Sequence, residues 1–233
     1  MSRSQTLASV AGDVKVSGRF RFLFATNDAA ARTGQPARAF ATVPGMTAVR
    51  RARPALVVCG PPAAGKSTLG RALAAQLQAT VLDQDVLTGP LTAVVSGLLG
   101  TSDLDSPELA RITRAARYET LLAVAEDNLP AGRPVVLVAP FSTERRDAAA
   151  WDALRDRLAR AGGEAALVWM RLSGDELLHR MTERAADRDR AKLADPRVYL
   201  QRVDLDPPSV VHIAVDAADP LAAQCATVLQ RLA

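Results

Sequence analysis

The sequence contains only two cysteines, Cys59 and Cys225, which lie far apart and outside any CxxC pair. Neither is close to a set of histidines, so a disulfide framework and a zinc site are both disfavoured. No apolar run reaches the roughly 18 residues that a membrane span needs, and the N-terminus lacks the apolar stretch of a secretory signal. We therefore expect two buried thiols and a cytoplasmic protein with no membrane segment.

Acidic residues are scarce at the start of the chain. Residues 1–53 contain nine Lys and Arg but only two acids, a net charge of +7, whereas the remainder carries 20 basic and 23 acidic residues, a net charge of −3. The formal charge of +4 for the whole chain therefore comes from its first segment. Non-specific binding to nucleic acid is favoured by a net positive field, so the charge distribution argues against a nucleic-acid partner.

Residues 1–53 show no sustained helical or strand period apart from a short apolar run at residues 20–24. We interpret them as a disordered, basic N-terminal extension. One alternative is an Arg-rich targeting or interaction arm. Another is that translation starts at Met46 and that the preceding residues are not part of the native protein. In each case the folded domain is expected at residues 54–233.

From Pro54 onward, short apolar runs alternate with longer helical segments. Strands are predicted at residues 55–59, 80–82, 135–139, 165–170 and 210–215. Helices are predicted at residues 66–77, after residue 82, and at 107–129, 151–161, 174–192 and from 220 onward. This alternation is typical of a parallel sheet with helices on both faces. The predicted fold class is α/β, a three-layer αβα sandwich with a five-stranded parallel sheet.

A phosphate-binding motif joins the first predicted strand to the first predicted helix. Residues 60–68 read GPPAAGKST and match G-x-x-x-x-G-K-[ST] at every fixed position. The glycines allow successive N–H groups to point at phosphate oxygens, and the helix N-terminus adds the positive end of its dipole. Lys66 is expected to pair with the β and γ phosphates, and the Ser67 hydroxyl to ligate magnesium. The predicted nucleotide-binding residues here are Gly60, Pro61, Ala63, Ala64, Gly65, Lys66, Ser67 and Thr68.

Two carboxylates follow the second predicted strand, in the sequence LDQDVL. The carboxyl ends of parallel strands line the ligand crevice, so Asp83 and Asp85 are expected where a substrate would face the γ phosphate. A hydroxyl that attacks phosphorus needs positioning and a proton acceptor. Asp85 is the candidate base, and Asp83 could orient it or hold magnesium through water. The alternative for Asp85 is that it caps the next helix.

The third predicted strand ends without the magnesium-binding aspartate of an ordinary Walker B strand, because Ala139 and Pro140 occupy that zone. This departure argues against an ATP-driven motor and leaves the metal to Ser67, water and Asp83. Arg145 and Arg146 follow shortly after and could bind substrate or phosphate, the alternative being a solvated helix start.

The most charged stretch, residues 178–190, contains arginines at every fourth position. On a helix, Arg180, Arg184 and Arg188 would form one ridge, as a lid over transferring phosphates requires. Arg184 and Arg188 are therefore candidate catalytic residues, and Arg180 a nucleotide contact. The alternative is a solvated helix whose arginines pair with its own acids, Glu183, Asp187 and Asp189.

These motifs resemble those of the P-loop kinases grouped with gluconate kinase, adenylylsulfate kinase, chloramphenicol phosphotransferase, zeta toxins and polynucleotide 5′-kinase. The resemblance covers residues 54–233 and is carried by VVCGPPAAGKST, by LDQD, by residues 118–132 leading into VVLVAPF, and by the Arg-rich stretch. It implies a P-loop, nucleoside-kinase-like fold, ATP with Mg²⁺, a catalytic role for Asp85, and phosphate contacts from the lid arginines. Polynucleotide kinases place an arginine three residues after their aspartate; Thr88 stands there in this chain.

The favoured hypothesis is an ATP-dependent kinase that phosphorylates a hydroxyl of a small molecule, which could be a metabolite, a nucleoside-like compound or an antibiotic. One alternative is a nucleotide-dependent regulatory switch or ATPase, which would be expected to carry a magnesium-sensing aspartate on the third strand. Another is a toxin-type kinase that acts on a nucleotide sugar. The protein is expected to be a monomer or a homodimer.

Overall fold

The computed structural model describes residues 52–101, 106–186 and 189–232. One of the three predicted lid arginines, Arg188, lies outside these residues. So does almost all of the predicted N-terminal extension.

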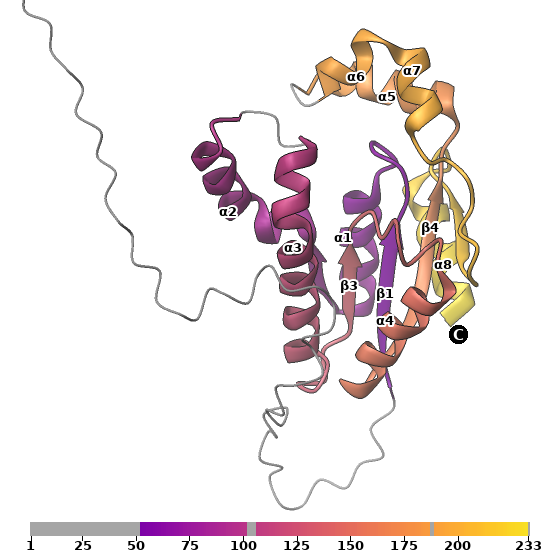
Figure 1. Ribbon diagram of the computed structural model, residues 1–233. Coiled ribbons are helices and arrows are strands. Elements are labelled where there is room, and N and C mark those ends of the chain that lie inside the picture. The colour runs from indigo at the N-terminus through magenta and orange to yellow at the C-terminus, as the bar shows by residue number, and fades with distance from the viewer. Residues whose placement is uncertain (1–51, 102–105, 187–188, 233) are drawn as a thin grey trace, which may run out of the picture. The chain divides into compact units, whose positions relative to one another are not determined.

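A single parallel sheet forms the centre of the described fold (Figure 1). Its strands lie in the order β2-β3-β1-β4-β5, and every pair is parallel. Such pairing requires crossover connections, which the helices provide. The five-stranded parallel sheet predicted from the sequence is thus confirmed. The strands are β1 (Arg53–Cys59), β2 (Thr80–Asp83), β3 (Val135–Val138), β4 (Gly163–Arg171) and β5 (Ile213–Asp216).

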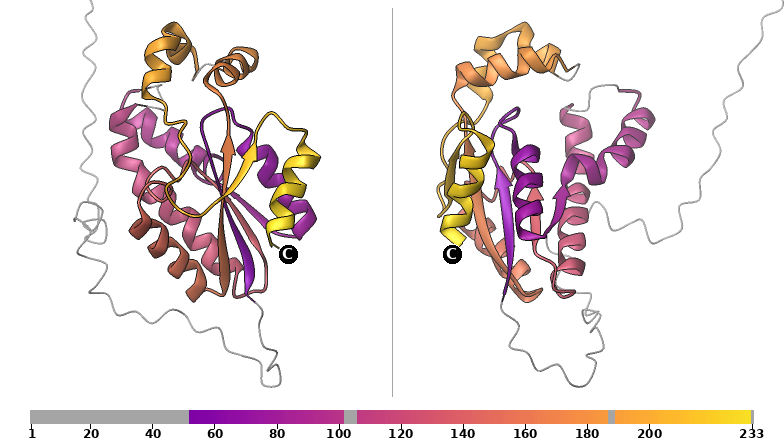
Figure 2. Two further views of the ribbon diagram at one scale, coloured as in Figure 1. Left: turned by 90° about the vertical axis from the view of Figure 1, so that its right-hand side faces the viewer. Right: turned by 180° about the vertical axis from the view of Figure 1, so that it is seen from behind.

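Helices cover both faces of the sheet (Figure 2). The helices are α1 (Lys66–Leu77), α2 (Gln84–Leu98), α3 (Pro107–Asn128), α4 (Ala148–Arg160), α5 (Gly174–Arg184), α6 (Arg190–Ala194), α7 (Pro196–Arg202) and α8 (Leu221–Leu232). Helices α1 and α8 share one hydrophobic core with the sheet, and α3 and α4 share another on the opposite face. The three-layer αβα prediction is therefore confirmed. Helices α5, α6 and α7 lie beyond the carboxyl ends of the strands (Figures 1 and 2).

The central strand β1 supplies residues to both cores. Leu56 and Val58 face one core, whereas Val57 and Cys59 face the other, and all four are fully buried. A strand that is buried on both faces reads as a continuous apolar run, which is why ALVVC was recognisable in the sequence. Cys59 and Cys225 are both buried free thiols, as predicted.

The predicted charged helix at residues 174–192 is wrong as a single element. Helix α5 ends at Arg184, and Ala185 takes a left-handed conformation with φ of 47°. Its N–H donates back to the carbonyl oxygens of Met181 and Thr182, which closes the last turn. The predicted ridge thus reaches only from Arg180 to Arg184 on one helix, because the backbone turns before residue 188.

The last strand begins three residues later than predicted. The sequence pattern placed it at residues 210–215, but pairing with β4 starts only where Val168 lies opposite Ile213. Val210 instead packs against the core on the α3 and α4 face. Periodicity alone could not separate a strand from an apolar loop that is buried by tertiary contacts.

No helix among the described residues is long and apolar enough to cross a membrane.

Candidate active site

The loop between β1 and α1 has two positions whose backbone conformation favours glycine. Gly60 has a φ of 143°, and a Cβ atom on it would lie 2.8 Å from the carbonyl oxygen of Met170. Gly65 has a φ of 87° and is the N-cap of α1. Both conformations are ones that side chains with a Cβ rarely adopt. The fixed glycines of the motif are therefore explained by the loop geometry, which leads directly into the N-terminus of α1.

Lys66 folds back over this loop. Its Nζ atom donates to the carbonyl oxygens of Gly60 at 3.0 Å and Pro61 at 2.7 Å. Burial lowers the pKa of Lys66 to about 8, and the nearby positive charge of Arg184 acts in the same direction. The carboxylates of Asp83 and Asp85 partly oppose this shift. A partly desolvated ammonium beside a helix N-terminus is well placed to bind an anion.

Ser67 and Asp83 bring two oxygen ligands together. The Ser67 hydroxyl donates to Asp83 Oδ2 at 2.5 Å. Asp83 is buried and is also the N-cap of α2, where its Oδ1 accepts from the backbone N–H of Asp85 at 3.0 Å. The helix cap that the sequence suggested as an alternative role for Asp85 therefore belongs to Asp83. Asp85 occupies the first turn of α2 instead.

Asp85 pairs with an arginine that the sequence reasoning missed. Arg117, on α3, donates from Nη2 to Asp85 Oδ1 at 2.6 Å and from Nε to the Thr88 hydroxyl at 2.9 Å. The Arg117 side chain is 23% exposed, whereas that of Asp85 is 68% exposed. The carboxylate is thus accessible to solvent, while the Arg117 guanidinium is held by two hydrogen bonds to α2. Such an arrangement fixes the orientation of the Asp85 carboxylate.

Gln84, between the two aspartates, is a buried side chain with an unused hydrogen-bond donor. It is 5% exposed, and its Nε2 atom has no hydrogen-bond partner among the described residues. Most buried polar groups are paired, so an orphan amide at a cavity wall calls for an explanation. A ligand that carries an acceptor oxygen would supply the missing partner.

The end of β3 carries no carboxylate toward the cavity, as the sequence indicated. Ala139 and Pro140 line the cavity in its place. The next residue, Phe141, is buried and has a φ of 44°, and its N–H donates to the Tyr118 hydroxyl at 2.9 Å. A non-glycine residue at this φ is strained, and the contact with α3 helps to hold it.

Two of the three arginines predicted to form a lid, Arg180 and Arg184, line the same cavity. Arg184 donates from Nε and Nη2 to Asp189, a carboxylate that is fully buried, with the Nε contact at 2.9 Å. Arg180 donates to Glu176 at 2.7 Å and to the carbonyl oxygen of Ala217 at 2.8 Å. The pairing of Arg184 with Asp189 matches the alternative in which an arginine forms an ion pair within the charged stretch itself. The burial of Asp189, however, does not match a solvated helix.

The cavity has a volume of about 460 Å³. It brings together residues of the phosphate loop and the aspartates that follow β2. Of the predicted residues it is lined by Ala63, Gly65, Lys66, Ser67, Thr68, Asp83, Asp85, Arg180 and Arg184. Residues that were not predicted also line it: Pro62, Gln84, Arg117, Asp189 and Lys192. Gly60, Pro61 and Ala64 shape the loop without lining the cavity.

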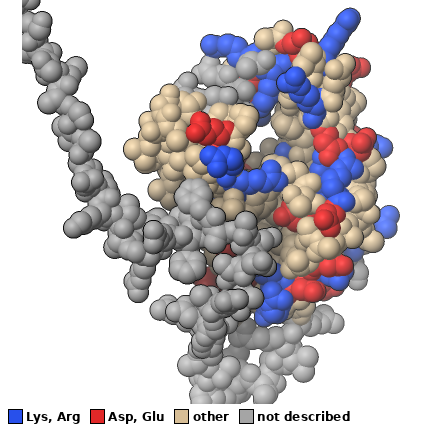
Figure 3. All heavy atoms as spheres, viewed as in Figure 1, with Lys and Arg blue, Asp and Glu red and all other residues tan. Residues whose placement is uncertain are grey.

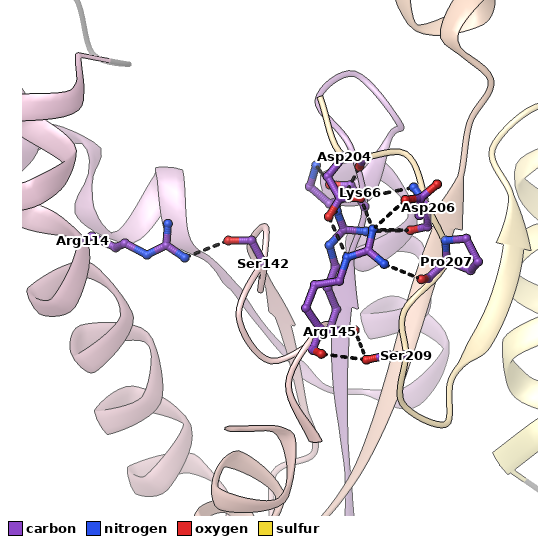
Figure 4. A network of polar contacts seen from close by, with 10 residues as sticks. Lys66, Arg114, Ser142, Arg145, Asp204, Asp206, Pro207 and Ser209 are labelled. Carbon is purple, nitrogen blue, oxygen red and sulfur yellow. Dashed lines mark hydrogen bonds and ion pairs between the residues drawn. The ribbon is translucent and has the colours of Figure 1, made fainter. Parts of the chain in front are cut away.

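Arg145 and Arg146 are not among the residues that line this cavity. Arg145 is 4% exposed and donates to the carbonyl oxygens of Asp204 and Asp206 (Figure 4). Arg146 donates to the Asp204 carboxylate and to the carbonyl oxygen of Pro207. The hydrogen bond from Arg146 holds the pKa of Asp204 below its usual range. Both arginines thus bind the segment that leads from α7 back to β5.

The cavity residues that were not predicted differ in whether the sequence contains any signal for them. Gln84 lies between two residues that were selected, and Asp189 and Lys192 lie in or beside the charged stretch. Arg117 gave no local signal, because its partner Asp85 is 32 residues away and the contact exists only when α2 packs on α3.

A family model described as an AAA domain matches residues 56–207 of the chain. A shikimate kinase from Corynebacterium efficiens is 36% identical over 77 residues, which cover 31% of this chain and 46% of that protein. The chain therefore matches less than half the length of this curated relative.

Two solved structures are similar over most of their length. A gluconokinase from Sinorhizobium meliloti 1021 is 26% identical, with a TM-score of 0.51 over 79% of this chain and 95% of that one. A proposed kinase from Chloroflexus aurantiacus j-10-fl is also 26% identical, with a TM-score of 0.55 over 78% of this chain and 97% of that one.

Proposed function

Since this chain belongs to the AAA-domain family and has the fold of P-loop small-molecule kinases, we propose that it is an ATP-dependent kinase acting on a hydroxyl group of a small molecule. The observation that carries the proposal is that one cavity contains both a phosphate loop and an arginine-held carboxylate. Phosphoryl transfer to a hydroxyl needs positioning, charge stabilisation and a proton acceptor.

The residues on the nucleotide side fit ATP with Mg²⁺. The loop glycines, the N-terminus of α1 and the ammonium of Lys66 suit phosphate oxygens. The Ser67 hydroxyl and the Asp83 carboxylate are adjacent oxygen donors, the ligand type that Mg²⁺ prefers. When bound, ATP supplies the phosphoryl group and Mg²⁺ neutralises charge on the phosphates. Lys66 would bind phosphate, and Ser67 and Asp83 would hold the metal.

The acceptor side is built by the first turn of α2 and by α3. Asp85 accepts the proton of the attacking hydroxyl on its carboxylate, and Arg117 keeps that carboxylate oriented. The orphan amide of Gln84 donates to an oxygen of the acceptor molecule. The acceptor in this proposal is therefore a compound with at least two oxygen functions, one that reacts and one that is recognised.

The lid side contributes positive charge. Arg184 stabilises charge that develops on the transferring group, and Asp189 fixes its guanidinium. Arg180 contributes a nucleotide contact beside Ala217. Arg188 keeps its predicted catalytic role as a hypothesis from the sequence. Arg145 and Arg146 receive no acceptor role, because their guanidinium groups bind the segment before β5.

The test is ADP release from ATP and Mg²⁺ by the wild-type protein, by Asp85→Asn and by a control variant, Asp156→Asn, whose side chain lies on the exposed face of α4. Each protein is assayed against pools of sugars and polyols, hydroxy acids, nucleosides, nucleotide sugars, and aminoglycoside or phenicol antibiotics. The expected result is that one pool stimulates the wild type and the control. Asp85→Asn should bind ATP normally and lose at least 10²-fold of that stimulated rate, as expected for a general base.

The outcomes separate the proposed function from its alternatives. Stimulation by nucleotide sugars alone would favour the toxin-type kinase. ADP release that no pool increases, and that Asp85→Asn leaves unchanged, would contradict the kinase proposal and support a regulatory ATPase.

A further inference from the structure

Helix α2 is packed with its polar side inward. Its buried side chains are Gln84, Thr88, Thr92 and Ser96, which recur every four residues along one face. Thr88 and Thr92 satisfy their hydroxyls on carbonyl oxygens one turn earlier in the same helix, at 2.6 and 2.8 Å. This polar face packs on α3, where Thr113 is buried in the same way. The usual arrangement of a surface helix, apolar inside and polar outside, is thus reversed.

Large apolar side chains of α2 are exposed to solvent instead. Val86 is 63% exposed, Leu91 72%, Val94 59% and Leu98 82%. Seven large hydrophobic residues of the described chain are more than about a third exposed, and five of them lie between residues 86 and 99. Single exposed apolar residues are ordinary, but a cluster on one helix face marks an interaction surface.

Three of these exposed residues, together with Leu87, have the spacing of a helix-pairing seam. Leu87, Leu91, Val94 and Leu98 follow one another at intervals of four, three and four residues. A 4-3-4 interval keeps the side chains in one stripe and is the pattern by which two helices interdigitate. Leu87, at the start of the stripe, is partly buried against the core next to α3, so the stripe continues outward from packed structure.

The absence of charge on this stripe indicates which kind of partner it can bind. No charged residue occurs from Val86 to Thr101, and Figure 3 shows the surface over α2 as a largely uncharged area. An acidic or basic peptide, or an anionic lipid surface, would find no complementary charge here. In a two-fold interface the same patch meets itself, so a patch without charge avoids like-charge repulsion.

From this reversed polarity, the 4-3-4 stripe and the absence of charge we infer that α2 is the interface of a homodimer, in which its apolar stripe packs against α2 of a second copy. The α2 and α3 helices of the two copies then form a four-helix arrangement around the two-fold axis. This inference does not depend on the proposed function, since none of the four residues of the stripe lines the cavity.

Sedimentation velocity of the full chain across about 0.1–100 μM tests the inference, with wild type, Leu91→Glu and a control, Val211→Glu. Val211 is 91% exposed and lies outside α2, so the control adds the same charge at an exposed apolar site elsewhere. Wild type and control should be dimers, and Leu91→Glu should weaken dimerisation by at least about 100-fold, as for a central anchor of an interface. Circular dichroism should show unchanged secondary structure in both variants, because both side chains are exposed.

A second measurement uses a single introduced thiol. Val94→Cys should be joined to its copy by a short bismaleimide at micromolar concentration, while the two native cysteines are buried and should not react. A wild type that stays monomeric at 100 μM would overturn the inference. So would a Leu91→Glu protein that remains dimeric, or binding of monomers to phosphatidylcholine vesicles that Leu91→Glu abolishes.

Discussion

Helices α1 and α2 both begin at the cavity, yet they are attached to the molecule in opposite ways. Helix α1 buries Leu69 and Leu73 fully in the core beneath the sheet, together with Gly70 and Ala74. Helix α2 buries Thr88, Thr92 and other polar side chains against α3 and leaves Leu91, Val94 and Leu98 largely in solvent. The phosphate loop is therefore anchored by apolar packing of α1 against the central strands, whereas Asp85, on the proposed acceptor side, lies on a helix that packs through polar side chains on α3.

This difference suggests a division of roles between the two helices. The nucleotide is the same whatever the acceptor, so a rigidly packed α1 suits it. A helix that does not depend on the sheet core can change its first turn without disturbing the fold. Four predictions, in order of decreasing effect, test whether α1 and α2 differ in this way.

The largest effect is expected in the core under α1. Leu73→Ala should lower the free energy of unfolding by about 2–5 kcal/mol, because Leu73 is fully buried and its truncation leaves a cavity. Urea denaturation followed by circular dichroism measures this change. A loss below about 1 kcal/mol would mean that α1 is not anchored by this packing.

The next effect concerns the start of each helix. Lys66→Ala should weaken the binding of ATP with Mg²⁺ by about 10²-fold, since it removes a charge-assisted contact to phosphate. Asp85→Asn, at the start of α2, should change that affinity by less than about threefold. Isothermal titration calorimetry gives both values. Equal losses in the two variants would show that the nucleotide and acceptor sides are not separate.

The affinity for ATP should also fall as the pH rises. Burial lowers the pKa of Lys66 to about 8 in the free protein, and bound phosphates favour the charged form, so the pKa rises on binding. Above pH 8 the free lysine must first take up a proton. Affinity should therefore drop about tenfold between pH 7 and pH 9. Calorimetry at both values checks this, and Lys66→Ala, which has no ammonium at this position, should show little of the decrease.

The smallest effect is expected in the polar face of α2. Thr92→Val keeps the shape of the side chain and removes one hydroxyl, which bonds to the Thr88 carbonyl oxygen at 2.8 Å. That carbonyl still accepts the helix N–H of residue 92, so the free energy of unfolding should fall by less than about 1 kcal/mol. The same urea assay applies. A loss above 2 kcal/mol would mean that α2 depends on its hydroxyls as strongly as α1 depends on its leucines.

The elements that were predicted correctly are those whose signal is contiguous. Helix α1 was placed at its exact bounds, because a glycine motif precedes it and leucines at every fourth position follow. The predicted charged helix failed at Ala185, whose left-handed conformation is enforced by bonds to the preceding turn and not by a glycine. The start of strand β5 was predicted too early because Val210 is apolar but packs against the core from a loop and not from a strand.

The alternation that makes a parallel sheet and the loop that suits phosphate could be predicted from the sequence, since both depend on consecutive residues. The sequence did not show that Arg117 holds Asp85 or that Arg145 binds the segment before β5, because these partners are 32 and about 60 residues apart along the chain. Each of these contacts depends on how separate elements pack. The orientation of α2 could not be predicted either, because its sequence has both a polar face and an apolar stripe. In the structure the polar face is the buried one, and α2 packs on α3.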